Sequence, residues 1–266
     1  MSTSKQRLDK LLLERGLVDS RSKATAMILA GKVRVDGRVV VKAGTLVSLA
    51  SSLEVMEQER WVSRGAHKLL KALSSFDVDP EDAVCIDVGA STGGFTQVLL
   101  ERGAKKVYAI DVGYGQLAWP LRQDKRVVVR ERTNARFLRR EDFDETADLI
   151  TIDVSFISLK LIIPVLVDLL SPNGDIIALI KPQFEAGKEH VSKGIISDPL
   201  LHESVLRDIT GFIEQATPLK LAGLTHSPIK GPKGNIEFLM HVTNKRVTPY
   251  VPDFEKIVKN AHDELD

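Results

Sequence analysis

Cysteine is almost absent from the sequence, since Cys85 is the only one among 266 residues. A disulfide scaffold, a cysteine-based zinc site and an iron–sulfur cluster are therefore excluded, and this usage is typical of the reducing cytoplasm. The six histidines show no metal-ligand spacing, so we expect no metal site. The first residues lack an apolar signal segment, and the most apolar stretch, 156–170, contains Lys160, Pro164 and Asp168. Because a span needs ~20 apolar residues, we expect a cytoplasmic protein with no membrane partner.

Net charge is also small, at +1, but the charges are unevenly distributed. Residues 1–72 hold 14 Lys and Arg against 7 Asp and Glu, whereas residues 73–266 hold 23 against 29. A basic first quarter predicts a small domain that binds a polyanion, although chance clustering on a solvated surface would give the same count. At ~150 residues per domain, the length is typical of one large and one small domain.

Two helices and a hairpin are predicted at the start of the chain. The leucines of 8–12 have helical spacing, and Ser20 can cap a second helix that ends before Gly31. Apolar residues then alternate around the Asp-Gly pair at 36–37, which is a strong signal for a two-residue hairpin turn. We expect one face of this unit to present a set of cations to phosphates, namely Arg21, Lys23, Lys32, Arg34 and Arg38. Two further candidate cations are Arg7 and Arg64.

The run SRSKATAMILAGKVRVDGRVV carries a resemblance to a known module. It is similar to the alpha-L RNA-binding module first described in a small-subunit ribosomal protein, and the resemblance covers roughly residues 5–60. It implies that the predicted cations bind RNA. The alternative is a stabilising appendage that binds nothing.

Strands and helices alternate in the rest of the chain, after a polar, acidic linker at 51–59. A helix that Ser63 can cap has a buried stripe that includes Ala66 and Leu69, and Lys68 lies off the centre of that stripe, where a lysine is usually exposed. Five apolar runs are predicted strands, at 83–89, 105–111, 127–129, 149–153 and 175–181. Helices are predicted at 95–102, 158–170 and 199–215, and two more strands at 219–225 and 236–242. This alternation predicts a largely parallel sheet covered on both faces.

A glycine-rich loop, DVGASTGGFT, follows the first strand of this sheet. Its backbone can turn at Gly89, and a ligand can approach the main chain at Gly93 and Gly94. Asp111 ends the next strand, 22 residues after Gly89, where a carboxylate can accept hydrogen bonds from ribose hydroxyls. The spacing departs from G-x-G-x-x-G and no second mononucleotide-binding half follows, which favours S-adenosylmethionine over NAD. The predicted cofactor-binding residues are Asp87, Gly89, Ala90, Ser91, Thr92, Gly93, Gly94, Phe95, Asp111, Asn134 and Asp153.

Six blocks together resemble one family. The alpha-L module, RWVSRGAHKL, DVGASTGGF, IDVSFISL, IKPQFE and GNIEF are similar to the TlyA family, whose members are often labelled haemolysin and belong with FtsJ-type ribosomal RNA 2′-O-methyltransferases. The resemblance implies an α/β, Rossmann-like, S-adenosylmethionine-dependent methyltransferase with a seven-stranded, mostly parallel sheet and a small N-terminal α+β RNA-binding domain. It also implies ribosomal RNA or a ribosomal subunit as partner and a cytidine ribose as acceptor. The family's Lys-Asp-Lys-Glu tetrad matches Lys68, Asp153, Lys181 and Glu237.

The predicted topology brings most of this tetrad to one edge of the sheet. Asp153 and Lys181 end parallel strands, and Glu237 begins a strand expected to run antiparallel, so these three belong at the carboxyl edge with the glycine loop. Lys68 must reach that edge from its helix. Lys181 is the candidate base for a ribose 2′-hydroxyl, and the ammonium of Lys68 would favour its neutral form. The two carboxylates would orient the amines and the hydroxyl, but would oppose that effect.

Alternative functions are disfavoured or stay open. Cytosine C5 methylation needs a cysteine nucleophile, whereas Cys85 is expected in the core. Amino-group methylation is disfavoured because the segment at 153–156 lacks the prolines of the usual motif. Phe156 could stack on a base or lie in the core, and Asn134 could contact an adenine or serve an ordinary loop. A catalytically silent RNA-binding or ribosome-assembly factor and a membrane-active haemolysin are the alternative functions, and the oligomeric state is open.

The expected domain boundaries follow from these motifs. They are an RNA-binding domain at 1–59, a linker at 60–64, a methyltransferase domain at 65–245 and a C-terminal tail or helix at 246–266.

Overall fold

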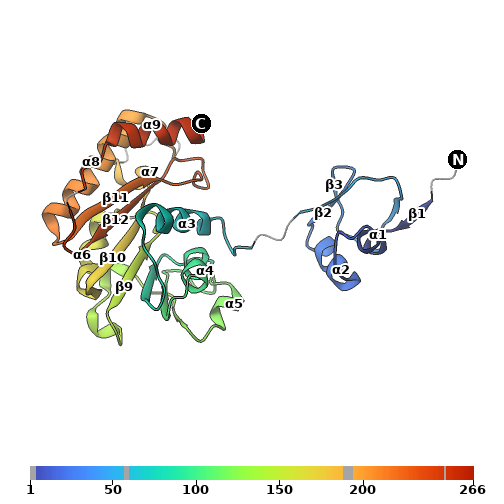
Figure 1. Ribbon diagram of the computed structural model, residues 1–266, viewed down its shortest axis with the longest axis horizontal. Helices are drawn as coiled ribbons and strands as arrows, with labels where there is room; N and C mark the ends of the chain where they lie inside the picture. The colour runs from blue at the N-terminus through green and yellow to red at the C-terminus, as the bar shows by residue number, and fades with distance from the viewer. Residues whose placement is uncertain (1–3, 57–59, 188–193, 249) are drawn as a thin grey trace. The chain divides into compact units, whose positions relative to one another are not determined.

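The computed structural model describes residues 4–56, 60–187, 194–248 and 250–266. The chain forms two compact units, Met1–Arg60 and Trp61–Asp266 (Figure 1). The boundary predicted at residue 59 lies outside the described residues, so it stays a prediction.

The N-terminal unit combines two helices with short strands. In chain order its elements are β1 (Lys5–Arg7), α1 (Leu8–Glu14), α2 (Arg21–Leu29), β2 (Val33–Val35), β3 (Arg38–Val39), β4 (Leu46–Ser48) and β5 (Leu53–Val55). The strands form a three-stranded sheet in the order β3-β2-β5 and a pair of β1 with β4. Completely buried leucine, isoleucine and valine side chains from both helices and β2 form the core.

The predicted caps and turn of this unit are confirmed, but its linker is shorter than expected. The hydroxyl of Ser20 accepts a hydrogen bond from the backbone N–H of Lys23, which caps α2. Asp36 and Gly37 both have positive φ, as a two-residue turn with the twist of a hairpin requires. The stretch predicted as linker from residue 51 includes β5, which pairs antiparallel with β2. Main-chain pairing with β2 therefore overrides its polar composition.

The C-terminal unit is an α/β fold around one sheet. Its strands are β6 (Val84–Val88), β7 (Lys106–Ile110), β8 (Val127–Arg130), β9 (Ala147–Ile152), β10 (Leu170–Ile180), β11 (Lys220–His226) and β12 (Phe238–Thr243). Its α-helices are α3 (Gly65–Phe76), α4 (Gly94–Glu101), α5 (Trp119–Arg122), α6 (Ile163–Leu166), α7 (Pro182–Glu185), α8 (Pro199–Ala216) and α9 (Phe254–Leu265). The strand order is β11-β12-β10-β9-β6-β7-β8, and only the pairings of β12 are antiparallel. The predicted seven-stranded, mostly parallel sheet is thus confirmed.

Both faces of this sheet are covered by helices. Successive side chains of a strand point to opposite faces, so each strand contributes to two clusters. In β6, Val84, Ile86 and Val88 pack in the cluster with α8 and α9, while Cys85 packs in the cluster with α3 and α4. Figure 1 shows these helix pairs on opposite sides of the strands. The strands therefore read as continuous apolar runs, and the expected core position of Cys85 is confirmed.

The one long helix predicted at 158–170 is wrong. This segment is broken into the 3₁₀ turn Leu159–Leu161, α6 and the 3₁₀ turn Val167–Leu169, and β10 begins at Leu170. Pro164 lies in the first turn of α6, where its missing N–H is tolerated, but a proline cannot continue a helix from the preceding turn.

Candidate active site

The glycine loop connects β6 to α4 at the carboxyl edge of the sheet. Gly89 has φ 85°, and a Cβ there would lie 2.5 Å from the backbone oxygen of Asp153. Gly93 has φ 98° and is the N-cap residue of α4. Only glycine fits these two positions without strain. At Gly89, the loop lies directly against the backbone that follows β9. Gly94 is equally close to the start of α3, because a Cβ there would lie 2.2 Å from Oγ of Ser63, just before this helix, and 3.1 Å from the backbone nitrogen of Ala66.

Asp87 lies behind this loop, where its carboxylate links α4 to β9 by hydrogen bonds. It is completely buried, and its carboxylate accepts hydrogen bonds from the hydroxyls of Thr96, at 2.6 Å, and Thr151, at 3.1 Å. Burial raises the pKa of Asp87 to about 7, while the hydroxyl donors oppose the rise. Asp87 lines neither of the two cavities at this edge of the sheet, so its predicted contact with a cofactor stays a prediction, and its observed role is to support the loop.

A cavity of about 410 Å³ lies between the ends of β6 and β7. The carboxylate of Asp111 accepts hydrogen bonds from the backbone N–H of Ser91, at 2.8 Å, and of Gly113, at 2.7 Å. A carboxylate has about four acceptor positions, so it can still accept bonds from a ligand's hydroxyls. Asn134 also lines this cavity, together with apolar side chains that include Val112, Ala135, Ile157 and Ile162. An apolar slot beside the Asp111 carboxylate suits a nucleoside.

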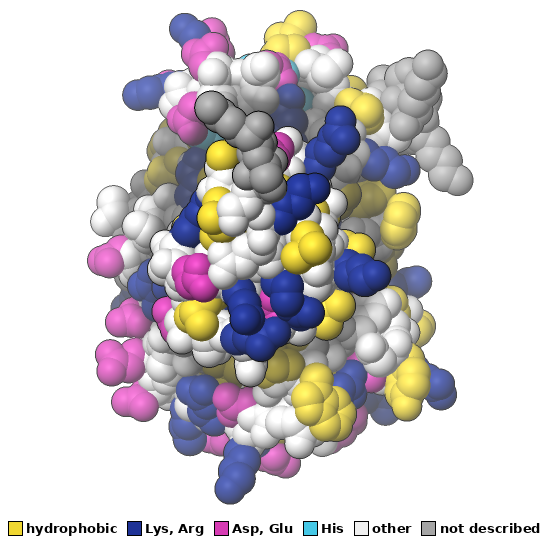
Figure 2. All heavy atoms as spheres, turned by 90° about the vertical axis from the view of Figure 1, so that its right-hand side faces the viewer, with side chains coloured by type: hydrophobic (Ala, Val, Ile, Leu, Met, Phe, Trp, Pro, Cys, Tyr) yellow, Lys and Arg dark blue, Asp and Glu magenta, His cyan; other side chains and the backbone are white. Residues whose placement is uncertain are grey.

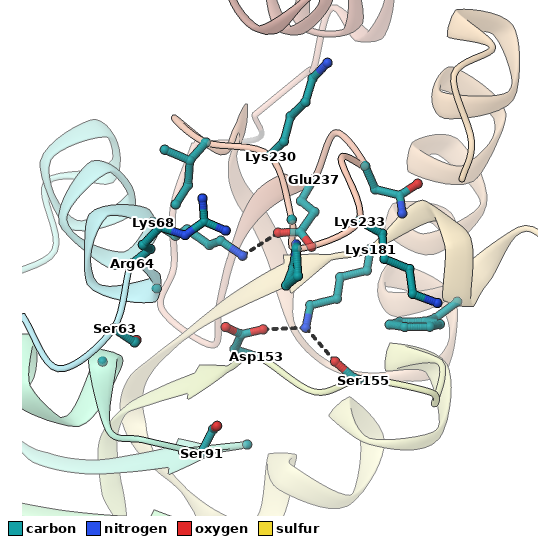
Figure 3. A pocket seen from close by; sticks show the side chains of 18 of the residues that line it. Ser63, Arg64, Lys68, Ser91, Asp153, Ser155, Lys181, Lys230, Lys233 and Glu237 are labelled. Carbon is teal, nitrogen blue, oxygen red and sulfur yellow. Dashed lines mark hydrogen bonds and ion pairs between the residues drawn. The ribbon is translucent and has the colours of Figure 1, made fainter. Parts of the chain in front are cut away.

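A second cavity, of about 620 Å³, holds all four residues of the predicted tetrad. The Nζ of Lys68 lies 2.5 Å from Oε2 of Glu237, and the Nζ of Lys181 lies 2.6 Å from Oδ1 of Asp153 (Figure 3). Lys68, Lys181 and Glu237 are all buried. The predicted convergence of these residues is what the structure shows, with two lysine–carboxylate pairs in one cavity.

Lys68 departs most from its expected surroundings. Only 7% of it is exposed, although it lies off the apolar stripe of α3. Burial raises the pKa of Glu237, whereas the ammonium of Lys68 lowers it. The net result is a raised pKa for a carboxylate that is 1% exposed.

The two cavities share a wall. Gly89, Ser91 and Asp153 line both, and so do Ser155 and Phe156. The other predicted loop residues, Ala90, Thr92, Gly94 and Phe95, line only the larger cavity. Gly93 lines neither cavity, so its predicted contact with the cofactor stays a prediction. A ligand in the smaller cavity can therefore extend past the glycine loop to the tetrad. Phe156 is 86% exposed, so its alternative role in the core is wrong.

The segment before β12 forms another wall, and its role is not evident from the sequence. The backbone N–H of Ser227 donates to the carbonyl of Glu237, and a Cβ at Gly231 would lie 2.4 Å from the Glu237 carboxylate. The side chain of Asn235 binds the backbone of Gly194 and Ile196. Lys230 and Lys233 from this segment line the larger cavity with Arg64 (Figure 3). The block GPKGN is the only signal that could have indicated this wall.

The predicted cations of the N-terminal unit do not share one face. Arg34 pairs with Val39 and Val35 with Arg38, and cross-strand partners point to the same side, so Arg34 and Arg38 point to opposite sides of the hairpin. The prediction of a single face is therefore wrong for the hairpin. Lys23 of α2 pairs with Asp19, which lies just before this helix. Figure 2 nevertheless shows Lys and Arg side chains gathered on the side of this unit that faces the viewer.

Arg7 and Arg21 are held by one buried carboxylate. Both side chains of this pair donate to Asp9, over 2.8 to 3.0 Å, and both remain about half exposed. The hydrogen bond from Arg7 is the main cause that lowers the pKa of Asp9 to about 2. Burial of the carboxylate opposes this effect, and Arg21 adds to it. Of the other four predicted cations of this unit, Lys32 is partly exposed, and Lys23, Arg34 and Arg38 are exposed.

Neither a metal cluster nor a membrane span is found in the described part of the chain. Among residues 4–56, 60–187, 194–248 and 250–266, no group of three or more His, Cys, Asp or Glu side chains could hold a metal ion. Within the same ranges, no helix has the length and hydropathy to cross a bilayer.

Comparisons with known proteins match both units. The FtsJ-like methyltransferase family matches residues 61–244, and the S4 domain matches residues 6–51. The chain is 49% identical, over 88% of its length and 88% of the relative's, to the 16S/23S rRNA (cytidine-2′-O)-methyltransferase TlyA of Mycobacterium tuberculosis. It is 46% identical, over 88% of its length and 98% of the relative's, to Hemolysin A of Brachyspira hyodysenteriae. A solved structure of a protein described as a hemolysin from Streptococcus thermophilus has a TM-score of 0.76, at 43% identity, over 99% of this chain and 98% of that one.

Proposed function

The chain belongs to the FtsJ-like methyltransferase family, and from this premise we propose that it transfers a methyl group from S-adenosylmethionine to a ribose 2′-hydroxyl of ribosomal RNA. One observation carries the proposal: the two lysine–carboxylate pairs meet in one cavity that shares a wall with a nucleoside-sized slot. The rRNA cytidine-2′-O-methyltransferase activity named for the 49% identical relative supports a cytidine as the target.

The residues of the smaller cavity fit the proposed cofactor. Asp111 would accept hydrogen bonds from the ribose hydroxyls, and Asn134 and the apolar lining would surround the adenine. The glycine loop would leave room for the chain that leads from the ribose to Asp153. When bound, S-adenosylmethionine supplies a methyl group on a positively charged sulfur.

The tetrad would prepare the acceptor hydroxyl. A neutral Lys181 amine would take the proton of the 2′-hydroxyl as its oxygen forms the new bond to the methyl carbon, and the electron pair of the broken carbon–sulfur bond would remain on sulfur. The resulting Lys181 ammonium would then release its proton to solvent. Asp153 would fix the position of Lys181 at 2.6 Å, and the Lys68–Glu237 pair would fix the opposite wall. Alignment of the reacting atoms would supply most of the acceleration.

The N-terminal unit would bind the RNA. Its match to the S4 domain and its exposed cations support binding to phosphates, which is strong but does not read sequence. The target nucleotide would then enter the larger cavity, where Arg64 lies at the wall and Phe156 could stack on its base. A ribosomal substrate would place the activity in the cytoplasm.

Transfer of tritiated methyl groups to ribosomal RNA tests this function. Purified protein and labelled S-adenosylmethionine would be incubated with free rRNA and with each ribosomal subunit, and the 2′-O-methyl positions mapped. Lys181→Ala should abolish transfer while calorimetry shows nearly unchanged cofactor binding, and Lys220→Ala, at an exposed lysine that lines neither cavity, should behave as wild type. Wild-type protein that binds RNA but labels none of these substrates would favour the silent assembly factor. Leakage from liposomes at low protein concentration would favour the haemolysin.

A further inference from the structure

Lys181 has a second hydrogen-bond partner besides its carboxylate. Its Nζ donates to Oγ of Ser155 over 3.0 Å, in addition to the 2.6 Å contact with Oδ1 of Asp153. Figure 3 shows the two acceptors on different sides of the amine. All three residues line the larger cavity, so the amine is fixed by the chain on two sides within the space that would hold the acceptor.

The number of N–H groups on a lysine amine gives this second contact a consequence. The protonated amine has three N–H donors and no lone pair, whereas the neutral amine has two N–H donors and one lone pair. With Asp153 and Ser155 as acceptors, both N–H groups of the neutral amine are engaged. The lone pair then has a single remaining direction. With Asp153 alone, one N–H and the lone pair could exchange places by rotation about the terminal carbon–nitrogen bond.

The backbone around Ser155 is held to the element that carries Lys181. Glu185, at the end of α7, accepts hydrogen bonds from the hydroxyl of Ser158, at 2.5 Å, and the backbone N–H of Leu159, at 2.9 Å. Helix α7 begins directly after Lys181. The Glu185 side chain thereby ties the segment after β9 to the helix that follows β10, which restrains the spacing between Ser155 and Lys181.

We propose that Ser155 is a positioning residue that directs the lone pair of Lys181 toward the acceptor hydroxyl, a role that rests on the proposed methyl transfer. Ser155 does not exchange a proton with the substrate. Its hydroxyl oxygen accepts one N–H of Lys181, and the electron balance of the transfer is unchanged by it. A substitution that removes this oxygen should therefore slow the chemical step and leave binding of cofactor and RNA as they are.

Single-turnover methyl transfer to rRNA tests the assignment in the full-length protein. Ser155→Ala should reduce the rate constant about 10- to 100-fold, as expected when a reacting group loses its orientation, while the dissociation constants for S-adenosylmethionine and rRNA change less than about twofold. Ser155→Thr keeps the hydroxyl and should recover most of the rate. Ser74→Ala removes an exposed serine of α3 outside both cavities and should match wild type.

Several outcomes would overturn the role of Ser155. They are a Ser155→Ala rate within twofold of wild type, a Ser155→Thr rate as low as that of Ser155→Ala, or a loss in Ser155→Ala that comes from weaker cofactor binding. Failure of the proposed function is a separate result, because wild type itself would then transfer no methyl group. In that event, nitrogen-15 NMR of the lysine side chains decides the contact: the Lys181 signal should shift in Ser155→Ala and stay near its wild-type position in Ser155→Thr, and an unchanged signal in Ser155→Ala would refute the hydrogen bond.

Discussion

Replacing Lys68 with methionine should destabilise the C-terminal unit in a pH-dependent way. The substitution keeps an unbranched side chain but leaves Glu237, which is 1% exposed, without the ammonium 2.5 Å from its carboxylate. Removal of one partner from a buried pair costs about 3 to 5 kcal/mol. Because Lys181 also acts on Glu237, we expect a loss near the lower end, about 3 kcal/mol at pH 8.

The sign of the pH dependence follows from the pKa of Glu237. Burial already raises this pKa above its unfolded value, and loss of Lys68 removes the main opposing effect. The folded Lys68→Met protein should therefore bind a proton at Glu237 more readily than the unfolded chain does. Its stability deficit should be small near pH 5, where a neutral carboxyl is buried, and should grow as pH rises to about 8.

Tryptophan fluorescence during urea unfolding measures this loss of stability, and it reports on the C-terminal unit of the chain. Trp61 and Trp119 are the only tryptophans, and both belong to the C-terminal unit. The double variant Lys68→Met/Glu237→Gln should recover about 2 kcal/mol at pH 8, because no buried charge is then unpaired. Equal deficits at pH 5 and pH 8, or no recovery in the double variant, would refute the buried pair as the cause.

Three further predictions test the loop, its support and the RNA-binding unit. Gly89→Ala should weaken S-adenosylmethionine binding in calorimetry by at least about tenfold, because its Cβ would lie 2.5 Å from the Asp153 carbonyl, and normal affinity would contradict the close approach. Asp87 has its pKa raised to about 7 by burial, so wild-type stability should fall as pH rises from about 4 to 7, and Asp87→Asn should flatten this slope in the same urea assay. Arg34→Ala should weaken rRNA binding and make the slope of log affinity against log salt shallower by about 0.7 to 0.9, whereas an unchanged slope would place Arg34 outside the phosphate contacts.

The sheet and three of the tetrad residues were predictable because they depend on local patterns. Apolar runs that end in Asp or Lys specify both the strands and the edge at which Asp153 and Lys181 emerge. The antiparallel entry of β12 then brings Glu237 to the same edge. The break at 158–170 and the strand β5 were missed because Pro164 and main-chain pairing override the composition of those segments.

Contacts between distant segments account for what the sequence could not predict. Helical periodicity places Lys68 off the apolar stripe of α3, and only the packing of α3 against β12 shows that this off-stripe position meets a buried carboxylate 169 residues further along the chain. The burial of a lysine at such a position can therefore be recognised only after the order of the strands in the sheet is known. The same holds for Ser155, whose contact with Lys181 joins the ends of two adjacent parallel strands. Because neighbouring parallel strands end side by side, polar residues within two or three positions of such ends are the ones to test first when a catalytic lysine is found there.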